Sequence, residues 1–543
     1  MLTGNTILAK ALRRHGMQHL FFIMGGPMID CENACRNEGV SMIDTRHEQA
    51  AAMMATAYSR LLRRPGVCMA ASGPGSTNLV TGVAHAYVDG APVIAVGGSS
   101  PVHQYGLGAF QEIDQLSMFK PITVWAERCY DPRRIPELVA AAFRHALAGP
   151  PGPVYLDMPG DVLYAEVPDD QVHWVQPDPG QRPPAGDSQA IADVYKVLAR
   201  AERPIVVAGS GVLWSGAAGE LRSWVERARV PFYTTPQARG LIPEDHDLSF
   251  LNARSAAFRE ADCVVVIGTR LNYVIGYARP PRFSPDAKLI QVDINPAEIA
   301  KTRAADAAVV GDAGTVLKQL LAAADELAPD RYAGWVRHLA ETNETKRRTA
   351  DQRLGTDRRP IHPLRLCKEV REVMERDAVL SVDGQEILNY ARQAIPVHSP
   401  GHSLNSGPFG TMGVGLPFGL GAKVAMPDKQ VVVLHGDGSF GLNGLEVDTA
   451  VRHQLPVLCV ISNNGGWTAA DKFKAGRELG FSRYDEMAKA FGCYAEHVEV
   501  PEQIRPALER ANKAVTDGQP AVLNVITDAG ARAGTVTFAD YST

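Results

Sequence analysis

Two short polar segments of this sequence could bind a metal ion. The first, GDGSF, contains Asp437, and the second, NNGG, contains Asn464 and Gly466. A carboxylate, an amide oxygen and a free backbone carbonyl are oxygen ligands of the kind that Mg²⁺ accepts in proteins. Because Mg²⁺ usually keeps positions for phosphate oxygens and water, we expect a diphosphate group to bind beside these residues.

Both segments directly follow a short apolar run, at residues 431–434 and 457–461. Each run is rich in β-branched residues and lacks polar alternation, which predicts a buried parallel strand. Residues 445–452 predict the crossover helix between the two strands. Since parallel strands joined in this way place both following loops at the same edge of the sheet, we expect Asp437 and Asn464 to lie side by side.

The glycines of the first segment favour a close approach of a ligand to the backbone. Gly436 and Gly438 flank Asp437, and Ser439 follows them with a hydroxyl group. Read separately, GDG is a common turn and NNGG a common loop cap. The combination of both with a strand–helix–strand unit favours a binding site.

Composition limits the class of protein. A length of 543 residues suggests about three or four domains. Sixty acidic and 55 basic residues give a formal charge of −5 without a basic block, so nucleic acid is not an expected partner. The sequence shows neither a membrane-spanning run nor a signal-peptide pattern, and its eight scattered cysteines fit a reducing compartment, which predicts a cytoplasmic protein.

Short apolar strands alternate with helical patterns along most of the chain, which is typical of α/β domains with doubly wound parallel sheets. The predicted organisation is a first domain at 1–172, a middle domain at 186–330, a linker at 331–360, a third domain at 361–530 and a tail at 531–543. A Pro-rich stretch separates the first two domains. We expect the first and third domains to be alike in layout.

The unit around Asp437 resembles the fingerprint of thiamine-diphosphate-dependent enzymes, in which GDG is followed after a fixed interval by NN. The resemblance covers nearly the whole chain and is to the acetolactate synthase and oxalyl-CoA decarboxylase type, closest to 2-hydroxyacyl-CoA lyases. It implies a pyrimidine-binding first domain, a Rossmann-like middle domain and a diphosphate-binding third domain. It also implies that Asp437, Asn464 and Gly466 hold the Mg²⁺ that grips the cofactor's diphosphate.

Glu48 is the strongest candidate for catalysis. It lies in RHEQAAAMMATAYSR, where an acidic residue in the first turn of a helix could simply complement the helix dipole. The segment is similar to the one that carries the cofactor-activating glutamate in this family. The resemblance implies that Glu48 hydrogen-bonds to the pyrimidine ring and promotes formation of the cofactor's carbanion.

Phe110 and Gln111 lie in a loop that resembles the AFQE-type loop of acetolactate synthase and its acyl-CoA relatives. The resemblance implies that both side chains face the reacting carbonyl, with Gln111 as a hydrogen-bonding residue. The alternative is a surface loop that starts a helix. The Phe-Gln pair departs from the Tyr-Glu pair associated with the oxalyl enzyme, which argues against oxalate chemistry.

Further cofactor contacts are expected in the third domain. Gly384 and Gln385 resemble the family's diphosphate loop. Met412 lies where the family places a methionine that wedges between the two rings of the cofactor and holds it bent. Without the resemblance, a methionine in such a turn would be core filler.

The middle domain offers a weaker nucleotide site. Gly209 follows one predicted strand and Asp293 follows another, where a carboxylate could bind an adenosine ribose. Relatives use this domain for FAD, for ADP or for no ligand, and ADP is the preferred choice here. A Rossmann-like spacer without a ligand is an equal alternative.

The resemblance implies a reaction in which a 2-hydroxyacyl-CoA thioester is cleaved to formyl-CoA and an aldehyde or ketone, with carboligation as the reverse. An acetolactate-synthase-like ligase or decarboxylase of 2-oxo acids, an oxalyl-CoA decarboxylase and a non-catalytic relative are the alternatives. Family precedent places the site between two subunits, so a homodimer is the minimum and a homotetramer the expectation. The polar segment 469–484 and the tail 531–543 are candidate covers of the active site.

Overall fold

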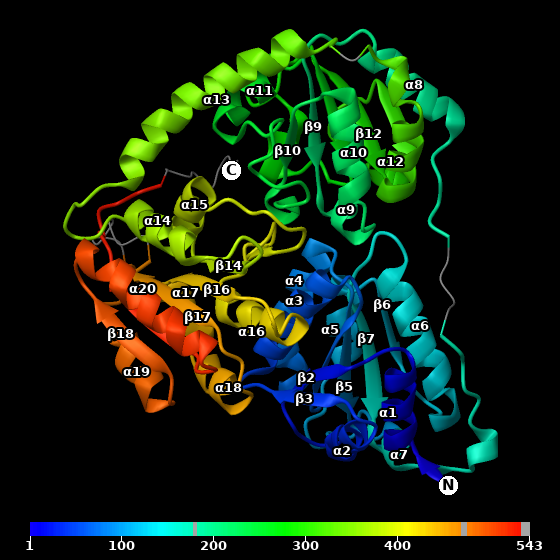
Figure 1. Cartoon of the computed structure of the whole chain (residues 1–543). Coiled ribbons are helices and arrows are strands. Elements are labelled where there is room, and N and C mark those ends of the chain that lie inside the picture. Colours follow the sequence, from blue (N-terminus) through cyan, green and yellow to red (C-terminus); the bar gives the residue numbers. More distant parts are fainter. Residues whose placement is uncertain (178–181, 329, 468–474, 534–543) are drawn as a thin grey trace.

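The computed structural model describes residues 1–177, 182–328, 330–467 and 475–533 of the chain. Its main elements are three parallel β-sheets with helices packed against them (Figure 1). This arrangement confirms the predicted α/β class with three doubly wound units.

The N-terminal unit has a six-stranded sheet in the order β3-β2-β4-β5-β7-β6. Its strands are β2 (His19–Phe22), β3 (Ser41–Asp44), β4 (Gly66–Ala70), β5 (Val93–Ser99), β6 (Trp125–Arg128) and β7 (Val154–Pro159). Its helices are α1 (Gly4–Arg14), α2 (Ile29–Asn37), α3 (Glu48–Leu62), α4 (Pro74–Asp89), α5 (Gln115–Phe119), α6 (Ile135–Leu147) and α7 (Gly160–Tyr164). A small antiparallel pair joins β1 (Leu2–Thr3) to β8 (Glu166–Val167).

The middle unit has a five-stranded sheet in the order β10-β9-β11-β12-β13. Its strands are β9 (Pro204–Ala208), β10 (Phe232–Thr234), β11 (Cys263–Ile267), β12 (Lys288–Asp293) and β13 (Ala307–Val310). Its α-helices are α8 (Ser188–Leu198), α9 (Ser210–Trp214), α10 (Ala218–Ala228), α11 (Arg254–Glu260) and α12 (Ala313–Ala322).

The C-terminal unit has a six-stranded sheet in the order β15-β14-β16-β17-β19-β18. Its strands are β14 (Val379–Asp383), β15 (Ser403–Asn405), β16 (Val431–Gly436), β17 (Leu458–Asn463), β18 (Tyr494–Val498) and β19 (Ala521–Ile526). Its helices are α14 (Pro363–Val373), α15 (Gln385–Ala394), α16 (Gly415–Ala425), α17 (Asp437–Asn443), α18 (Glu446–Arg452), α19 (Tyr484–Ala490) and α20 (Pro501–Thr516).

The two outer sheets share one topology. Numbered within each unit, both have the strand order 2-1-3-4-6-5, and the middle sheet follows 2-1-3-4-5. In such sheets the chain reverses direction of winding between the first and third strands, and the carboxyl ends of these strands form a crevice. The crevices therefore lie after β2 and β4, after β9 and β11, and after β14 and β16.

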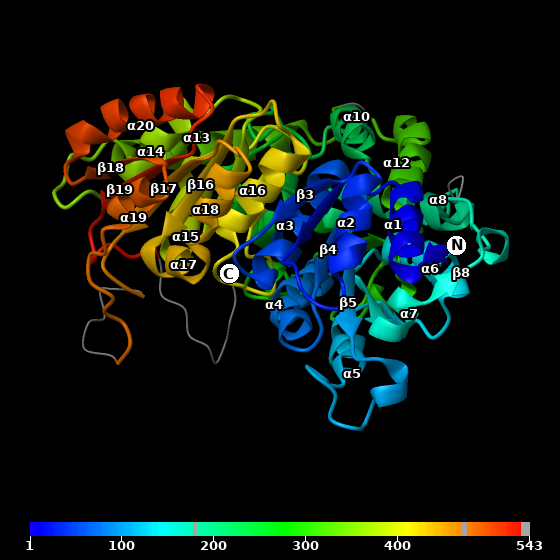
Figure 2. The ribbon, with the colours of Figure 1, turned by 90° about the horizontal axis from the view of Figure 1, so that it is seen from below.

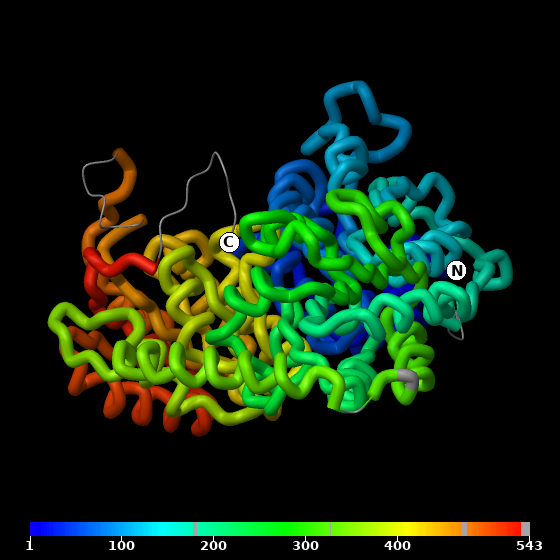
Figure 3. The backbone as a smooth tube through the Cα atoms, turned by 90° about the horizontal axis from the view of Figure 1, so that it is seen from above, coloured from blue at the N-terminus to red at the C-terminus, as the bar shows by residue number. Residues whose placement is uncertain are grey.

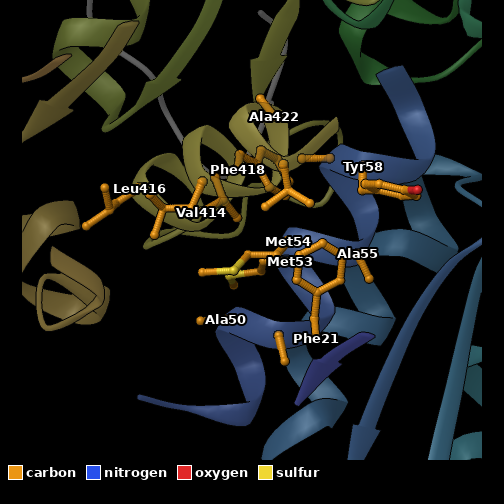
Figure 4. Packing of buried hydrophobic residues seen from close by; sticks show 14 of the residues in the cluster. Phe21, Ala50, Met53, Met54, Ala55, Tyr58, Val414, Leu416, Phe418 and Ala422 are labelled. Atoms are coloured by element: carbon orange, nitrogen blue, oxygen red, sulfur yellow. The ribbon is translucent and has the colours of Figure 1, made fainter. Parts of the chain in front are cut away.

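The N- and C-terminal units meet where α3 packs against α16 (Figure 4). Met53 of α3 and Leu416 and Phe418 at the other helix belong to one buried apolar cluster. The helices approach closely because a Cβ atom at Gly421 would lie 2.4 Å from the backbone oxygen of Met54. Fully burying each of these large side chains stabilises the packing by about 1.5–3 kcal/mol.

The charged stretch after the middle unit forms α13 (Ala333–Leu354), the longest helix of the described chain. It runs from the middle unit toward the C-terminal unit along the outside of the molecule (Figures 1 and 3). A connector was expected here, and the helix is mostly exposed. It is not wholly solvated, however, because Trp335 and Leu339 are buried against the middle unit.

A buried ion pair of the N-terminal unit forms hydrogen bonds with a residue of the middle unit. Arg60 of α3 is 3% exposed and lies 3.3 Å from the carboxylate of Asp89 on α4. It also donates a hydrogen bond to the backbone oxygen of Gln237, whose side-chain amide donates to Asp89 at 2.5 Å. The carboxylate of Asp89 therefore has a donor from each unit at this boundary.

Replacing Arg60 with Met should lower the free energy of unfolding by about 3–5 kcal/mol, because Asp89 would be left buried without its cation. Urea denaturation measures this change. The exposed ion pair between Arg222 and Glu226, 2.8 Å apart on α10, offers the matched control. Arg222→Met should cost less than about 0.5 kcal/mol, and equal losses at both sites would contradict the expectation.

Candidate active site

The crevice of the C-terminal unit brings together two loops that the sequence separates by about 50 residues. Gly384 follows β14 and has φ = 115°, a backbone conformation that a side chain would strain. A Cβ atom on Gly384 would lie 3.0 Å from the backbone nitrogen of Gly436, at the end of the neighbouring strand β16. Gln385 begins α15 with an exposed side chain. The backbones of the two loops therefore approach each other closely at this edge of the sheet.

Asp437 begins α17 at this edge and is 3% exposed. Burial raises the pKa of Asp437 to about 6, while backbone N–H groups at Gly438, Asn464 and Gly466 favour its charged form. Its Oδ2 atom has no hydrogen-bond partner among the described residues. The structure therefore places Asp437 beside the NNGG segment, with a carboxylate oxygen left over for a ligand.

These residues fit a magnesium ion. The Asn464 side-chain oxygen accepts a hydrogen bond from Gly466 N at 3.2 Å, which points the amide oxygen back into the loop. The described residues contain no group of three or more His, Cys, Asp or Glu that could hold a metal. A metal here would depend on one carboxylate supplemented by amide and backbone oxygens, which suits a hard cation with a diphosphate as its further ligand.

Beneath the loops lies a buried polar network that the sequence did not reveal. Ser439 donates to the backbone oxygen of Asp383 at 3.0 Å and lies 3.0 Å from Nδ1 of His435. Asp383 accepts from the backbone of Gly415 at 3.0 Å, at the start of α16. Burial lowers the pKa of His435 to about 3 and raises the pKa of Asp383 to about 7. The network is buried and holds the conformations of the loops above it.

Glu48 lies in a different crevice, that of the N-terminal unit. It is the first residue of α3, and its Oε2 atom accepts a hydrogen bond of 3.0 Å from the side chain of Asn78 on α4. A Cβ atom at Gly75 would lie 3.5 Å from its other carboxylate oxygen. The glycine-rich loop after β4 therefore borders the carboxylate, which is half-buried.

Gln111 lies against the same glycine-rich loop. The hydroxyl of Ser72 donates to Gln111 Oε1 at 2.8 Å, and a Cβ atom at Gly73 would lie 2.4 Å from the Gln111 backbone oxygen. Gln111 has φ = 57°, so its backbone turns sharply at this point. The structure thus brings Gln111 and Glu48 to one loop.

Phe110 is 86% exposed and Leu107 is 78% exposed, on a loop that projects beyond the rest of the N-terminal unit (Figure 2). Hydrogen bonds within the loop hold its conformation. The carboxylate of Glu112 accepts them from the backbone nitrogens of residues 106, 108 and 109 at 2.6, 3.1 and 2.8 Å. In the single chain Phe110 therefore points to solvent rather than into a site.

Met412 lines a pocket of about 390 Å³ between the N- and C-terminal units. Residues on both sides of Glu48 line the same pocket, which is bounded by His47, Gln49, Thr81, Phe409, Thr411, Met412, Leu442 and Asn443. Glu48 itself turns toward Asn78 instead. The single chain thus presents two groups of candidate residues, one around Glu48 and Gln111 and the other around Asp437 and Asn464.

The candidate nucleotide residues of the middle unit lie at the carboxyl edge of its sheet. A Cβ atom at Gly209 would lie 2.2 Å from the Thr269 side chain, so this glycine serves close packing of the loops after β9 and β11. Asp293 ends β12 and accepts a hydrogen bond from Asn295 N at 2.9 Å, and burial raises its pKa. Since β11 separates β9 from β12, the two residues are not on neighbouring strands.

Two expectations fall partly outside the described residues. The first part of the polar segment 469–484 lies in the undescribed range 468–474, and most of the tail 531–543 lies in 534–543. Among the described residues, no helix has the length and apolar character needed to cross a membrane. All eight cysteines are buried free thiols.

Sequence comparison identifies the class of protein that this fold and these sites define. The N-terminal TPP-binding domain of thiamine pyrophosphate enzymes matches residues 2–118, their central domain matches 191–320, and their C-terminal TPP-binding domain matches 386–525. The chain belongs to the thiamine pyrophosphate enzyme family.

Individual relatives span nearly the whole chain. The acetolactate synthase large subunit IlvG of Mycobacterium tuberculosis is 36% identical over 96% of this chain and 95% of its own length. The 2-hydroxyacyl-CoA lyase of Arabidopsis thaliana is 32% identical, covering 98% and 97%. The oxalyl-CoA decarboxylase of Escherichia coli K12 is 32% identical, covering 99% and 97%. The relatives agree on the family and differ in activity.

Proposed function

We propose that the chain is a thiamine-diphosphate-dependent carbon–carbon lyase that acts on 2-hydroxyacyl-CoA thioesters. The observation that carries the proposal is the position of Gln111, whose neutral amide is held by Ser72 on the loop that borders Glu48. An amide can orient a substrate hydroxyl or carbonyl without competing for its proton. The similarity to 2-hydroxyacyl-CoA lyases over nearly the full length supports this choice.

In the proposed reaction, the bond between the thioester carbonyl carbon and the hydroxyl-bearing carbon breaks. The hydroxyl-bearing carbon loses its hydroxyl proton and leaves as an aldehyde or ketone. The carbonyl carbon takes up a proton and leaves, still attached to sulfur, as formyl-CoA. Bound thiamine diphosphate supplies the nucleophilic carbon for this chemistry. The reverse reaction joins the same two products.

The residues of the chain have distinct proposed roles. Glu48, oriented by Asn78, exchanges a proton with the pyrimidine ring of the cofactor. Asp437, Asn464 and Gly466 hold Mg²⁺ and, through it, the diphosphate. The loops that contain Gly384 and Gln385, and Gly436, Gly438 and Ser439, surround the phosphates, and Met412 supports the cofactor between its rings. In the middle unit ADP remains the proposed ligand, near Gly209 and Asp293.

We also propose that the site forms between two copies of the chain. Each copy would contribute Glu48 and Gln111 to the other's Asp437, which fits the orientation of Glu48 toward its own α4. Exposed apolar side chains flank both groups of residues: Leu107 and Phe110 on one side, Leu442 and Phe481 on the other. A second copy would cover them. A homodimer is the minimum assembly, and a homotetramer fits as a pair of dimers.

Mixing two inactive variants tests the shared site. Glu48→Gln and Asp437→Asn chains, unfolded together in equal amounts and refolded, should regain about a quarter of wild-type activity, because half of random dimers contain one intact site. Each variant refolded alone is the control. If the mixture stays as inactive as its components, although mixed dimers are present by mass spectrometry, the site lies within one chain.

A substrate panel tests the reaction. Purified protein with thiamine diphosphate and Mg²⁺ is given a 2-hydroxyacyl-CoA, oxalyl-CoA or pyruvate, and the products are separated by mass spectrometry. Formyl-CoA and an aldehyde in equal amounts are expected from the first substrate. Acetolactate from pyruvate alone would favour the acetolactate synthase alternative, which the 36% identity supports. Formyl-CoA with carbon dioxide from oxalyl-CoA alone would make the chain a decarboxylase.

A further inference from the structure

A carboxylate of the C-terminal unit binds the backbone immediately before Glu48. Glu446 begins α18 and is 1% exposed. Its Oε1 atom accepts hydrogen bonds of 3.1 Å from the backbone nitrogens of both Arg46 and His47, and its Oε2 atom lies 3.2 Å from Arg46 N. Thr449 donates to the same Oε2 atom at 2.6 Å. The carboxylate is thus fully used by partners on two units.

The same short helix contacts the end of β3. Arg452 donates to a carboxylate oxygen of Asp44 at 2.5 Å and to its backbone oxygen at 3.1 Å. His453, directly after the helix, lies 2.8 Å from the other carboxylate oxygen of Asp44. The chain between β3 and α3 is therefore held at both of its ends by α18, and α3 begins at Glu48 immediately after the second contact.

These contacts are well placed to set the direction of the Glu48 side chain. His47 is the N-cap of α3, with an extended backbone (φ = −148°, ψ = 139°), so the chain changes direction at this residue. Two backbone N–H groups bound to one buried carboxylate fix that change of direction, because losing them would leave the buried Glu446 carboxylate with fewer partners, at a cost in free energy. The dihedral angles at 47 decide where the first side chain of the helix points.

We propose that Glu446 is a positioning residue for Glu48. It does not touch the cofactor site, and it acts through the backbone at Arg46 and His47. Glu446 lies in the β16–β17 crossover that also contains Asp437, so one crossover segment serves both groups of site residues. The inference rests on the proposed role of Glu48 in activating the cofactor.

The test compares Glu446→Ala and Glu446→Gln with a matched control. Glu369 is also a buried carboxylate of the C-terminal unit, paired with Arg365 at 2.9 Å and Arg505 at 2.7 Å, on the remote helix α14. Glu369→Gln reports what the loss of a buried charge does to stability alone. Glu446→Gln keeps one oxygen that can accept a backbone hydrogen bond, so its exchange rates should lie between those of Glu446→Ala and wild type.

Two readouts are independent of the acyl-CoA substrate. In the cofactor-free protein, amide deuterium exchange of the peptide 44–50 should become faster in Glu446→Ala and stay unchanged in Glu369→Gln. With thiamine diphosphate bound, the exchange of its reactive C–H proton should slow by about 100-fold in Glu446→Ala, as expected for a misplaced catalytic group. Binding of Mg²⁺ and the cofactor should change by less than about threefold, since Asp437 is intact.

The turnover number should fall together with the C–H exchange rate, while KM stays near wild type. Two results for Glu446→Ala would overturn the inference. In the first, the amides of 44–50 exchange at the wild-type rate. In the second, these amides exchange faster, but the C–H proton of the cofactor still exchanges at the wild-type rate. Failure of the proposed function looks different: Glu48→Gln would then leave the cofactor proton exchanging at the wild-type rate. A wrong substrate class would alter neither exchange readout.

Discussion

Replacing Glu48 with Gln is expected to lower turnover by about 10²–10⁴-fold while the protein stays folded. Glutamine preserves the shape of the side chain and can still bind Asn78, which lies 3.0 Å from the carboxylate. It cannot exchange a proton with the pyrimidine ring, so the step that activates the cofactor is lost. Steady-state kinetics measures the effect, and circular dichroism checks the fold.

The matched control is Glu341→Gln on α13, where the carboxylate is exposed and remote from both crevices. This variant should keep wild-type kinetics. An active Glu48→Gln enzyme would show that another group activates the cofactor, and the assignment of Glu48 would have to be withdrawn.

Replacing Asp437 with Asn is expected to weaken Mg²⁺-dependent binding of thiamine diphosphate by more than about 100-fold. The substitution removes the only carboxylate of the proposed ligand set, and a neutral amide attracts a divalent cation much less strongly. The buried Oδ2 atom, which lacks a partner among the described residues, is the oxygen whose charge would be lost. Isothermal titration calorimetry with cofactor and Mg²⁺ measures the change.

Raising the Mg²⁺ concentration should restore part of the lost affinity, because the remaining oxygen ligands are unchanged. Asp428→Asn, an exposed residue of the same unit, is the control and should bind as wild type does. If Asp437→Asn and wild type bind the cofactor with equal affinity, Asp437 does not hold a metal ion at this edge of the sheet.

The fold was largely predictable because apolar runs mark buried parallel strands. The runs 431–434 and 457–461 correspond to β16 and β17, but both strands extend two residues further, through Gly436 and Asn463. These extensions are polar yet buried, with His435 1% exposed and Asn463 fully covered. Hydrophobic periodicity cannot reveal a strand that continues through polar residues whose partners lie elsewhere in the fold, such as Ser439 on α17 for His435 and Asn524 on β19 for Asn463.

The crossover helix illustrates a different limit. One helix was expected at 445–452, whereas the structure has α17 from Asp437 and α18 from Glu446. A Cβ atom at Gly444 would lie 2.9 Å from the Phe440 ring, so the chain turns tightly between the two helices. The first helix begins within GDGSF. Because glycine has a low helix propensity, propensity alone does not predict a helix there.

The partners of the site residues were the least predictable part. Asn78 binds Glu48 from 30 residues away, and Glu446 binds Arg46 from 400 residues away. No local pattern marks either contact, since the first depends on how two helices of one unit pack and the second on how two units pack. The candidate residues themselves were recognisable because turn glycines, carboxylates and amides follow strand ends, where ligand crevices form.

The projecting loop that contains Leu107 and Phe110 has a practical consequence. Its backbone is shaped by hydrogen bonds to Glu112, so the two outward side chains contribute little to its folding. Both positions can therefore be randomised in a combinatorial library without disrupting the fold of the single chain. If the site forms between two copies as proposed, directed evolution at this loop should alter substrate preference and subunit pairing rather than the folding of the loop itself.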